Sequence, residues 1–313
     1  MVVSLSAQDV QSLASWPLVI GAIRKGHLLP KADIGDTFVH AQNSTMLVRS
    51  AYIDGLAAGV KAATVVPENP DKTPPLPSVH AQIMLFAPDN GQLTALVDGT
   101  EVTAWKTAGD SALGCDLLAR QDCETMLMIG AGSMAEPLIR AHLSVRPSIK
   151  TIRLWNRSVE RVAGLAERLN DLPQNVVVEA DLDTAIPKAD IVCCATMAKT
   201  PLLKGELLKE GAHVDLVGAF KADMREADDD VHRRGRWFVD SRDTTIGHIG
   251  ELKLPIREGV IGESAVIGDL HQLVAGDQRR MSEKDITVFK NGGGAHLDIM
   301  VSAALVQAYE RRV

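Results

Sequence analysis

Short apolar segments alternate with helical patterns from about residue 124 to residue 220, and this alternation constrains the fold more than any other feature. Apolar strands that alternate with helices indicate parallel β-α-β units, whose strands are buried on both faces. This region is therefore predicted to be an open, doubly wound parallel sheet of the α/β class. The predicted strands are TMLMIG, TIRLWN, NVVVEA, DIVCCAT and HVDLVGA, and the predicted helices are SMAEPLIRAHLSV, SVERVAGLAERLND and DLDTAIPKA.

The turn after the first of these strands carries a dinucleotide-binding fingerprint. In MLMIGAGSMAEPL, Gly130, Gly132 and Ala135 form G-x-G-x-x-A between a predicted strand and a predicted helix. The first glycine permits a tight turn, the second lets the backbone approach a pyrophosphate, and the small third residue lets helix and strand pack closely. The helix N-terminus offers free N–H groups to the phosphates. A Rossmann-type NAD(P) site is predicted here, and its further candidate residues are Ser133, Met134 and Thr196.

The second predicted strand ends in LWNRS, which bears on the choice of coenzyme. Asn156 falls about twenty residues past the fingerprint, where a carboxylate would bind the ribose 2′-hydroxyl of NAD. A carboxylate would repel a 2′-phosphate, whereas Arg157 can pair with one and Ser158 can donate to one. Such a charge-assisted bond contributes roughly 1.5–3 kcal/mol, or about ten- to hundredfold in affinity. NADPH is therefore predicted, with NADH also possible; the alternative is a surface turn with a solvated arginine.

The first 120 residues follow a different pattern. GVKAATVV, VHAQIMLF and QLTALVDG resemble strands separated by turn-rich segments, which suggests antiparallel pairing. A helix, TAWKTAGDSALGCDLLARQ, leads into the parallel region, and HLDIMVSAALVQAYERR forms a last helix after the break NGGG. That helix is expected to return to the first domain. The predicted domains are residues 1–119 plus 293–313, and residues 120–292.

Composition limits the classes of partner. The net charge of -7 argues against nucleic acid, which requires a basic face. No polybasic run suggests a membrane surface, and no apolar run approaches the length of a bilayer span. The N-terminal segment lacks the basic start of a signal peptide, and Ser6 with Asp9 is expected to begin a helix there. Four cysteines without a CxxC pair fit small buried side chains in a reducing compartment, so a cytoplasmic location is predicted.

Several segments follow one another in the order found in one protein family: GVKAATVVPEN, GQLTALVDGTEVTAWKTAGDSALG, MIGAGSMAEP, LWNRS, GAHVDLVGAFKADMREADDDV and DITVFKNGGGAHLD. Over most of its length the chain resembles the ornithine cyclodeaminase/mu-crystallin family. That family includes ornithine cyclodeaminases, alanine dehydrogenases, cyclic imino-acid reductases and NADPH-binding mu-crystallins. The resemblance implies a dinucleotide domain inserted in an α+β domain that binds substrate and forms a homodimer.

The resemblance also implies site residues in the α+β domain. Lys61 matches the family lysine of G-x-K, near the substrate carboxylate and the reacting carbon. A buried, unpaired ammonium tends to lose its proton, which suits a proton donor or an anion anchor; the alternative is an outward-facing strand lysine. Lys106 replaces the family arginine of RTAA, which keeps the charge but loses the bidentate fork, and Thr107 is retained beside it as a cofactor contact. Arg49 is a candidate for another missing family arginine, with a packing or surface role as the alternative.

One departure from the family weighs against cyclodeamination. Ornithine cyclodeaminases carry an aspartate in the segment matched by GAFKA, where this chain has Phe220. Phenylalanine can neither accept a proton nor orient a water. Asp215 and Asp223 are near in sequence, but neither occupies the matching place.

Other polar residues are weaker candidates. The pairs His248 with Glu251 and His296 with Asp298 lack a third ligand at a recognisable spacing. They are expected to be hydrogen-bonding residues, and no metal site is predicted. His80 is kept as a possible proton donor.

These observations together predict an NADPH-dependent reductase of a C=N bond in a small α-imino acid, such as a cyclic ketimine carboxylate, or a related amino-acid dehydrogenase. Lys61, Lys106 and Arg49 would hold the carboxylate, and Lys61 or a water would keep the imine nitrogen protonated. One alternative is ornithine cyclodeaminase with recycled NAD. The other is a largely non-catalytic protein that binds NADPH or another small ligand.

Overall fold

The computed structural model describes residues 2–312, and the chain divides into two compact units. One unit comprises Met1–Thr107 and Gly294–Val313, and the other is Ala108–Gly293. The second unit therefore interrupts the first in sequence. The sequence pattern places the first boundary at 119/120, whereas the compact units divide at 107/108 because the 20-residue helix α3 (Gly99–Leu118) belongs partly to each.

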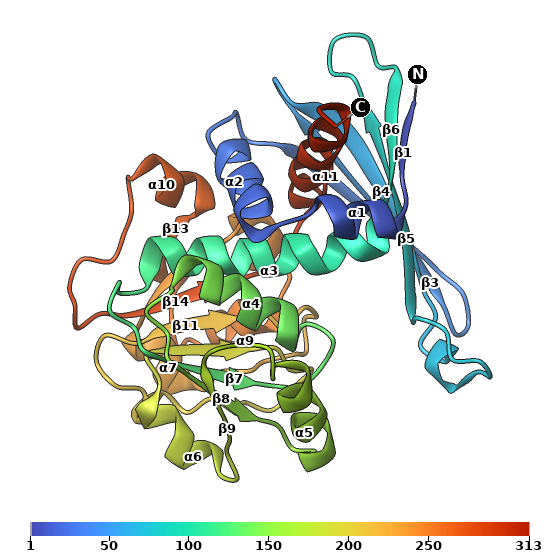
Figure 1. Cartoon of the computed structure of the whole chain (residues 1–313). Coiled ribbons are helices and arrows are strands. Elements are labelled where there is room, and N and C mark those ends of the chain that lie inside the picture. The colour runs from blue at the N-terminus through green and yellow to red at the C-terminus, as the bar shows by residue number, and fades with distance from the viewer. Residues whose placement is uncertain (1, 313) are drawn as a thin grey trace. The chain divides into compact units, whose positions relative to one another are not determined.

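The first unit is built on a six-stranded sheet in the order β1-β6-β5-β4-β3-β2. β1 runs parallel to β6, and the other neighbours are antiparallel. Figure 1 shows helices α1, α2 and α11 on one side of this sheet, against which α1 and α11 pack. The elements are β1 (Val3–Leu5), α1 (Ala7–Leu13), α2 (Trp16–Gly26), β2 (Asp33–His40), β3 (Thr45–Ile53), β4 (Ala57–Val65), β5 (Val79–Phe86), β6 (Leu93–Asp98) and α11 (Ala295–Glu310).

Local sequence explains most of these elements. α1 begins where Ser6 and Asp9 form a capping box, as predicted. The last helix, α11, returns to this unit, also as predicted, and packs directly on β4. The contact is so close that a Cβ on Gly59 of β4 would overlap Ile299 of α11. β2 and β3 were not predicted. β2 is a largely exposed edge strand, so it lacks the apolar alternation on which such predictions depend.

The second unit is an eight-stranded parallel sheet in the order β13-β12-β14-β11-β10-β7-β8-β9, which confirms the predicted doubly wound fold. The five predicted strands are β7 to β11, whereas β12, β13 and β14 were not predicted. The chain leaves β7 towards β8 on one side and returns to β10 on the other, and ligands bind at such a switch point beyond the carboxyl ends of the strands.

The elements of the second unit, coloured green to orange in Figure 1, are β7 (Thr125–Ile129), α4 (Ala135–Val145), β8 (Thr151–Trp155), α5 (Val159–Arg168), β9 (Asn175–Val178), α6 (Leu182–Ala185), β10 (Ile191–Cys194), β11 (His213–Leu216), α7 (Asp229–Arg234), β12 (Gly235–Val239), α8 (Arg242–Thr245), α9 (Gly250–Arg257), β13 (Val266–Asp269), α10 (Leu270–Ala275) and β14 (Ile286–Lys290). β10, β11 and β14 are buried along their whole length. All four cysteines are free and buried in this unit. Within residues 2–312, no helix is both long enough and apolar enough to cross a membrane.

Candidate functional site

The fingerprint forms the turn between β7 and α4. Gly130 has a φ of 111°, and a Cβ there would lie 2.6 Å from the carbonyl oxygen of Ala195, so only glycine fits. Gly132 has open space around its Cα, which leaves its backbone accessible to a ligand. Ala135 is buried as the first residue of α4. Each residue thus has the geometry that its place in the motif requires.

Backbone N–H groups at this turn are available to an anion. The amides of residues 131–134 have no acceptor in the described chain, and no side chain caps α4. Free amides and a partial positive charge at the start of an 11-residue helix suit a phosphate. Ser133 and Met134 lie in this turn, Ser133 exposed and Met134 half-buried. The turn therefore fits the pyrophosphate of a dinucleotide.

The LWNRS corner lies between β8 and α5. The guanidinium of Arg157 is exposed and has no hydrogen-bond or ion-pair partner among residues 2–312. Asn156 donates through Nδ2 to the carbonyl of Ser158 at 3.3 Å. Ser158 caps α5 by accepting from the amide of Arg161, and its hydroxyl donates to Glu160 Oε2 at 2.8 Å. The serine hydroxyl is therefore engaged already, which the sequence did not reveal, while Arg157 remains available.

A hollow of about 560 Å³ lies beside the fingerprint turn. Its lining combines residues of the turn with one face of α5, and it brings a second unpaired cation to the site. Arg161 has no side-chain partner within the described residues, whereas Arg168 pairs with Glu136 at 3.0 Å. The lining residues are Ala131, Gly132, Ser133, Glu136, Arg161, Gly164 and Arg168.

The two threonines predicted to contact the coenzyme lie in different units. Thr196 follows β10, and its amide and hydroxyl both donate to Glu226 Oε1, at 2.7 and 2.8 Å. Its Cγ2 would lie 3.3 Å from a Cβ at Gly130, so it is next to the fingerprint turn. Thr107 is half-buried on α3. Contact of Thr107 and Thr196 with the coenzyme therefore stays a prediction.

In the first unit, Lys61 and Lys106 share one buried carboxylate. The Nζ of Lys61 lies 3.1 Å from Asp298 Oδ1, and the Nζ of Lys106 lies 3.7 Å from Asp298 Oδ2. Lys61 also donates to the hydroxyl of Thr103. Burial would raise the pKa of Asp298, but the two lysines together lower it below its ordinary value. The interpretation of Lys61 as an unpaired or outward-facing lysine is therefore wrong, because Asp298 compensates its charge.

Arg49 lies on β3 directly opposite Lys61 in the register of β3 and β4, so both side chains leave the same face of the sheet. Its guanidinium binds Asp36 through Nε and Nη2, at 2.8–3.1 Å, which leaves Nη1 without a partner in the described chain. Arg49, Lys61 and Lys106 pair with only two carboxylates, those of Asp36 and Asp298, so the group carries one net positive charge. We call the set Arg49, Lys61, Lys106, Asp36 and Asp298 the lysine cluster.

Asp298 is the site residue that sequence reasoning undervalued. It was expected to be only a satisfied hydrogen-bonding residue; it does accept from Lys61, but it is also fully buried and bridges two lysines. The only signal in the sequence was its place one turn into the helix after NGGG. Glu251 is buried and accepts two backbone N–H bonds, as expected for a structural residue, whereas His248 is exposed.

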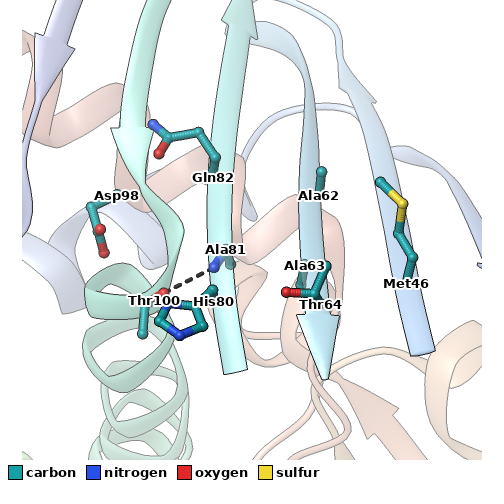
Figure 2. Close-up of a pocket in the computed structure, with 9 residues that line it drawn as sticks. All are labelled: Met46, Ala62, Ala63, Thr64, His80, Ala81, Gln82, Asp98 and Thr100. Atoms are coloured by element: carbon teal, nitrogen blue, oxygen red, sulfur yellow. Dashed lines mark hydrogen bonds between the residues drawn. The ribbon is translucent and has the colours of Figure 1, made fainter. Parts of the chain in front are cut away.

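His80 does not lie on the face that carries Lys61. Lys61 is opposite Ile83 in the register of β4 and β5, so strand alternation turns His80 to the other face. Figure 2 shows it among the residues that line a hollow of about 390 Å³. Because α11 packs on the face that carries Gly59 and Lys61, His80 points away from α11. His80 is therefore not next to Lys61, and its suggested role as a proton donor stays a prediction. The hollow is lined by Met46, Ala62, Ala63, Thr64, His80, Ala81, Gln82, Asp98 and Thr100.

In the segment after β11, neither nearby aspartate takes the place of the carboxylate that Phe220 replaces. Phe220 is 55% exposed, and the Nζ of Lys221 lies 5.5 Å from the centroid of its ring. Asp215 is buried within β11, and Asp223 forms an exposed ion pair with Lys199 at 2.7 Å. Neither aspartate is placed as a free acid or base beside Phe220.

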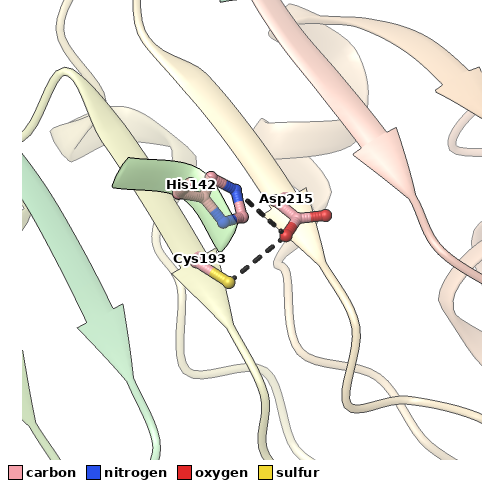
Figure 3. Close-up of side chains that lie close together, drawn as sticks. All are labelled: His142, Cys193 and Asp215. Carbon is pink, nitrogen blue, oxygen red and sulfur yellow. Dashed lines mark hydrogen bonds and ion pairs between the residues drawn. The ribbon is translucent and has the colours of Figure 1, made fainter. Parts of the chain in front are cut away.

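One buried group of residues has spacings that could suit a metal. Asp215 Oδ2 lies 3.5 Å from His142 Nε2 and 3.3 Å from the Cys193 sulfur (Figure 3). Ser111 donates to the other oxygen, Oδ1, at 3.0 Å. A metal would require the cysteine thiolate. Burial and the charge of Asp215 raise the pKa of Cys193 well above its ordinary value, and burial also raises the pKa of Asp215. The thiol therefore acts as a hydrogen-bond donor in a proton-sharing network.

Residues 31–312 match the model of the ornithine cyclodeaminase/mu-crystallin family. The chain belongs to this family. The comparison confirms the resemblance inferred from the motifs, and it covers both compact units.

Several relatives of the chain share one kind of chemistry. The chain is 47% identical to a Δ1-pyrroline-2-carboxylate reductase of Paracoccus denitrificans, over 97% of this chain and 96% of that protein. Its structure is similar to that of Δ1-pyrroline-2-carboxylate reductase of Thermococcus litoralis in complex with NADH and L-proline, with a TM-score of 0.91, 32% identity and coverage of 99% and 98%. It is also similar to the iminosuccinate reductase of Paracoccus denitrificans in complex with NAD⁺, with a TM-score of 0.92, 25% identity and coverage of 99% and 97%.

Proposed function

We propose that this protein is an NAD(P)H-dependent reductase of cyclic imino acids, with Δ1-pyrroline-2-carboxylate as its substrate and proline as the product. The observation that carries the proposal is the lysine cluster, whose single net positive charge matches a substrate with one carboxylate. The five-membered ring follows from the names of the Paracoccus and Thermococcus relatives. Phe220 weighs against ornithine cyclodeaminase, because it cannot serve the amine or the water of that reaction.

The substrate carboxylate binds the cations of the lysine cluster. Lys106 is held by Asp298, and Arg49 is held by Asp36 with Nη1 free to donate. Ion pairs within the cluster fix these side chains before the substrate arrives, so less conformational entropy is lost on binding. The two carboxylates also lower the net charge, which favours a monoanion over a dicarboxylate.

Lys61 acts as the proton donor. Its ammonium group carries three protons, of which two are directed to Thr103 and Asp298, so one remains for the imine nitrogen. Protonation makes the imine carbon electrophilic, and the new N–H bond of proline retains that proton. The coenzyme supplies the hydride to the imine carbon from C4 of its nicotinamide. Asp298 stabilises the charged lysine before the transfer.

The coenzyme binds the second unit. The amides of residues 131–134 hold the pyrophosphate, with Gly130, Gly132 and Ala135 shaping the turn. Arg157, joined by Arg161, binds a 2′-phosphate, so NADPH is preferred and NADH is accepted more weakly. The unpaired state of both guanidinium groups supports this preference. Asn156 and Ser158 shape the corner rather than donate to the phosphate, since each already has a partner.

The protein forms a homodimer through the face of its six-stranded sheet that lies away from α1, α2 and α11. On that face Met46 and Tyr52 are exposed, and Met84 on the neighbouring strand is half-buried. Contiguous exposed apolar surface on a sheet is typical of a protein interface. A cytoplasmic location fits the four free cysteine thiols.

The test is an oxidation screen with NADPH and with NADH over cyclic and acyclic imino acids. Δ1-pyrroline-2-carboxylate should be reduced fastest, and NADPH should give the higher kcat/KM. Release of ammonia from ornithine without added reductant would instead identify a cyclodeaminase. Binding of NADPH without oxidation by any imino acid would identify a non-catalytic binding protein.

A further inference from the structure

Glu226 connects two loops of the second unit through a single buried carboxylate. Oε1 accepts from the amide and the hydroxyl of Thr196, in the loop after β10. Oε2 accepts from the amides of Gly218 and Ala219, in the loop after β11, at 2.7 and 3.1 Å. Glu226 is fully buried, and both of its oxygens face only donors in these contacts. An ionised carboxylate is the group that satisfies such a set of donors.

These loops lie at the edge of the sheet where a dinucleotide binds. Both follow the carboxyl ends of parallel strands on the same side of β7, the strand before the fingerprint turn. The loops are closely apposed, because a Cβ at Gly218 would overlap Thr196, and Thr196 in turn is next to Gly130. The LWNRS corner lies on the opposite side of β7, at β8. With the adenosine at that corner, the nicotinamide half of the coenzyme falls at the loops that Glu226 holds.

The same loops present large apolar side chains to solvent. Met197 is 70% exposed, and Phe220 is 55% exposed. Exposed large apolar side chains at a ligand-binding edge of a sheet are expected where a ring will be buried on binding. The Glu226 contacts lie one residue away from each of them, at Thr196 and Ala219.

We propose that Glu226 is a positioning residue for the nicotinamide half of the coenzyme, because it fixes the loops after β10 and β11 in the arrangement that binds this half. The inference rests on the proposed function, since it requires a nicotinamide coenzyme at this edge. It adds a residue outside the fingerprint and outside the lysine cluster, which acts through the backbone of other residues.

Fluorescence titration of the full chain with NADH, beside titration with ADP-ribose, separates positioning from general structural support. ADP-ribose retains the pyrophosphate and the adenosine but lacks the nicotinamide. Glu226→Gln turns an acceptor into an NH₂ group that faces N–H donors, so NADH affinity should fall at least tenfold, while ADP-ribose affinity stays within twofold. Equal losses for both ligands, or no loss for either, would overturn the proposal.

Asp190→Asn is the matched control. Asp190 Oδ2 also accepts two backbone amides, from Glu124 and Thr125, but at the amino-terminal edge of β7 and β10. This variant should lower the unfolding temperature without changing NADH affinity. If it weakens NADH as much as Glu226→Gln does, the effect is general loosening of the sheet and the proposal fails.

The pH dependence of NADH binding provides a readout that also applies to the unaltered protein. Burial and the charge of Glu251 raise the pKa of Glu226 to about 7, against the opposing effects of Lys290 and the hydrogen bonds from Thr196. Other buried groups near this carboxyl include Cys194, which is held as the neutral thiol. NADH affinity should therefore fall as the pH drops below about 7, and Glu226→Gln should remove that fall. NADH is used because it lacks the 2′-phosphate, which titrates near pH 6.

Failure of this proposal and failure of the proposed function give different results. If the unaltered chain binds NADH and reduces an imino acid, but Glu226→Gln binds NADH normally, only the positioning role is refuted. If NADH binds and responds to Glu226→Gln while no imino acid is reduced, only the reductase activity is refuted. If the unaltered chain binds no nicotinamide coenzyme, both are refuted.

Discussion

Replacement of Lys61 by methionine tests the proposed chemistry most directly. Methionine keeps most of the side-chain volume on β4 but removes the ammonium group. Asp298 then faces Lys106 alone, so the lysine cluster changes from one net positive charge to none. The fold should persist, because the buried Asp298 keeps one cationic partner at 3.7 Å.

Two effects of known size contribute to the expected loss of activity. Loss of the cluster's net positive charge weakens its attraction for the substrate carboxylate, and since a charge-assisted interaction contributes about 1.5–3 kcal/mol, KM for the imino acid should rise by up to roughly ten- to hundredfold. A positioned general acid typically contributes about 10²–10⁴-fold to the rate, so kcat should fall by at least about a hundredfold. Both changes follow from one atom, the Nζ that contacts Asp298 and Thr103.

The assay measures steady-state oxidation of NADPH with Δ1-pyrroline-2-carboxylate, together with NADPH binding by fluorescence. Lys61→Met and Lys61→Ala should both bind NADPH within twofold of the unaltered protein while kcat/KM falls. Lys72→Met is the control, because Lys72 is an exposed lysine of the same unit, bound to Asn69. If kcat and KM of Lys61→Met match those of Lys72→Met, Lys61 has no part in the reaction.

Four further predictions concern the coenzyme, stability and assembly. Arg157→Ala should weaken NADPH binding about ten- to hundredfold with little change for NADH, and an equal change for both would place this residue away from the 2′-phosphate. Asp298→Ala should lower the free energy of unfolding in urea by about 3–5 kcal/mol at pH 7, because it leaves two buried lysines without their carboxylate. Because the pKa of Asp298 is lowered in the folded protein, its ionised form stabilises the fold above the unfolded pKa of about 3.9, and this stabilisation is lost as the pH falls through the folded pKa. The free energy of unfolding of Asp298→Asn should therefore decrease less steeply as the pH falls through this range than that of the unaltered protein. Met84→Asp, on the sheet face away from α11, should give monomers in light scattering, and a dimer of unchanged stability would move the interface elsewhere.

Local sequence patterns determined the parallel sheet and its dinucleotide turn. Strands β7 to β11 are recognisable because each is a short apolar run flanked by helical periodicity, and both properties lie within a few residues. The positive φ required at Gly130 is likewise a local property, so the spacing of G-x-G-x-x-A is enough to identify the turn. The position of Arg157 at the end of the second strand of the parallel sheet could likewise be predicted from its spacing to the fingerprint alone.

Only the tertiary structure decided which charges meet. Lys61 and Asp298 lie 237 residues apart in sequence, and neither neighbourhood carries a signal that the two will form an ion pair. The two loops held by Glu226 follow different strands, so their shared carboxylate is invisible to periodicity. His80 was found to lie on the opposite sheet face from Lys61 only once the register of β4 and β5 was known. Sequence periodicity reports which face of an element is apolar, whereas the pairing of buried charges depends on how distant elements pack against one another.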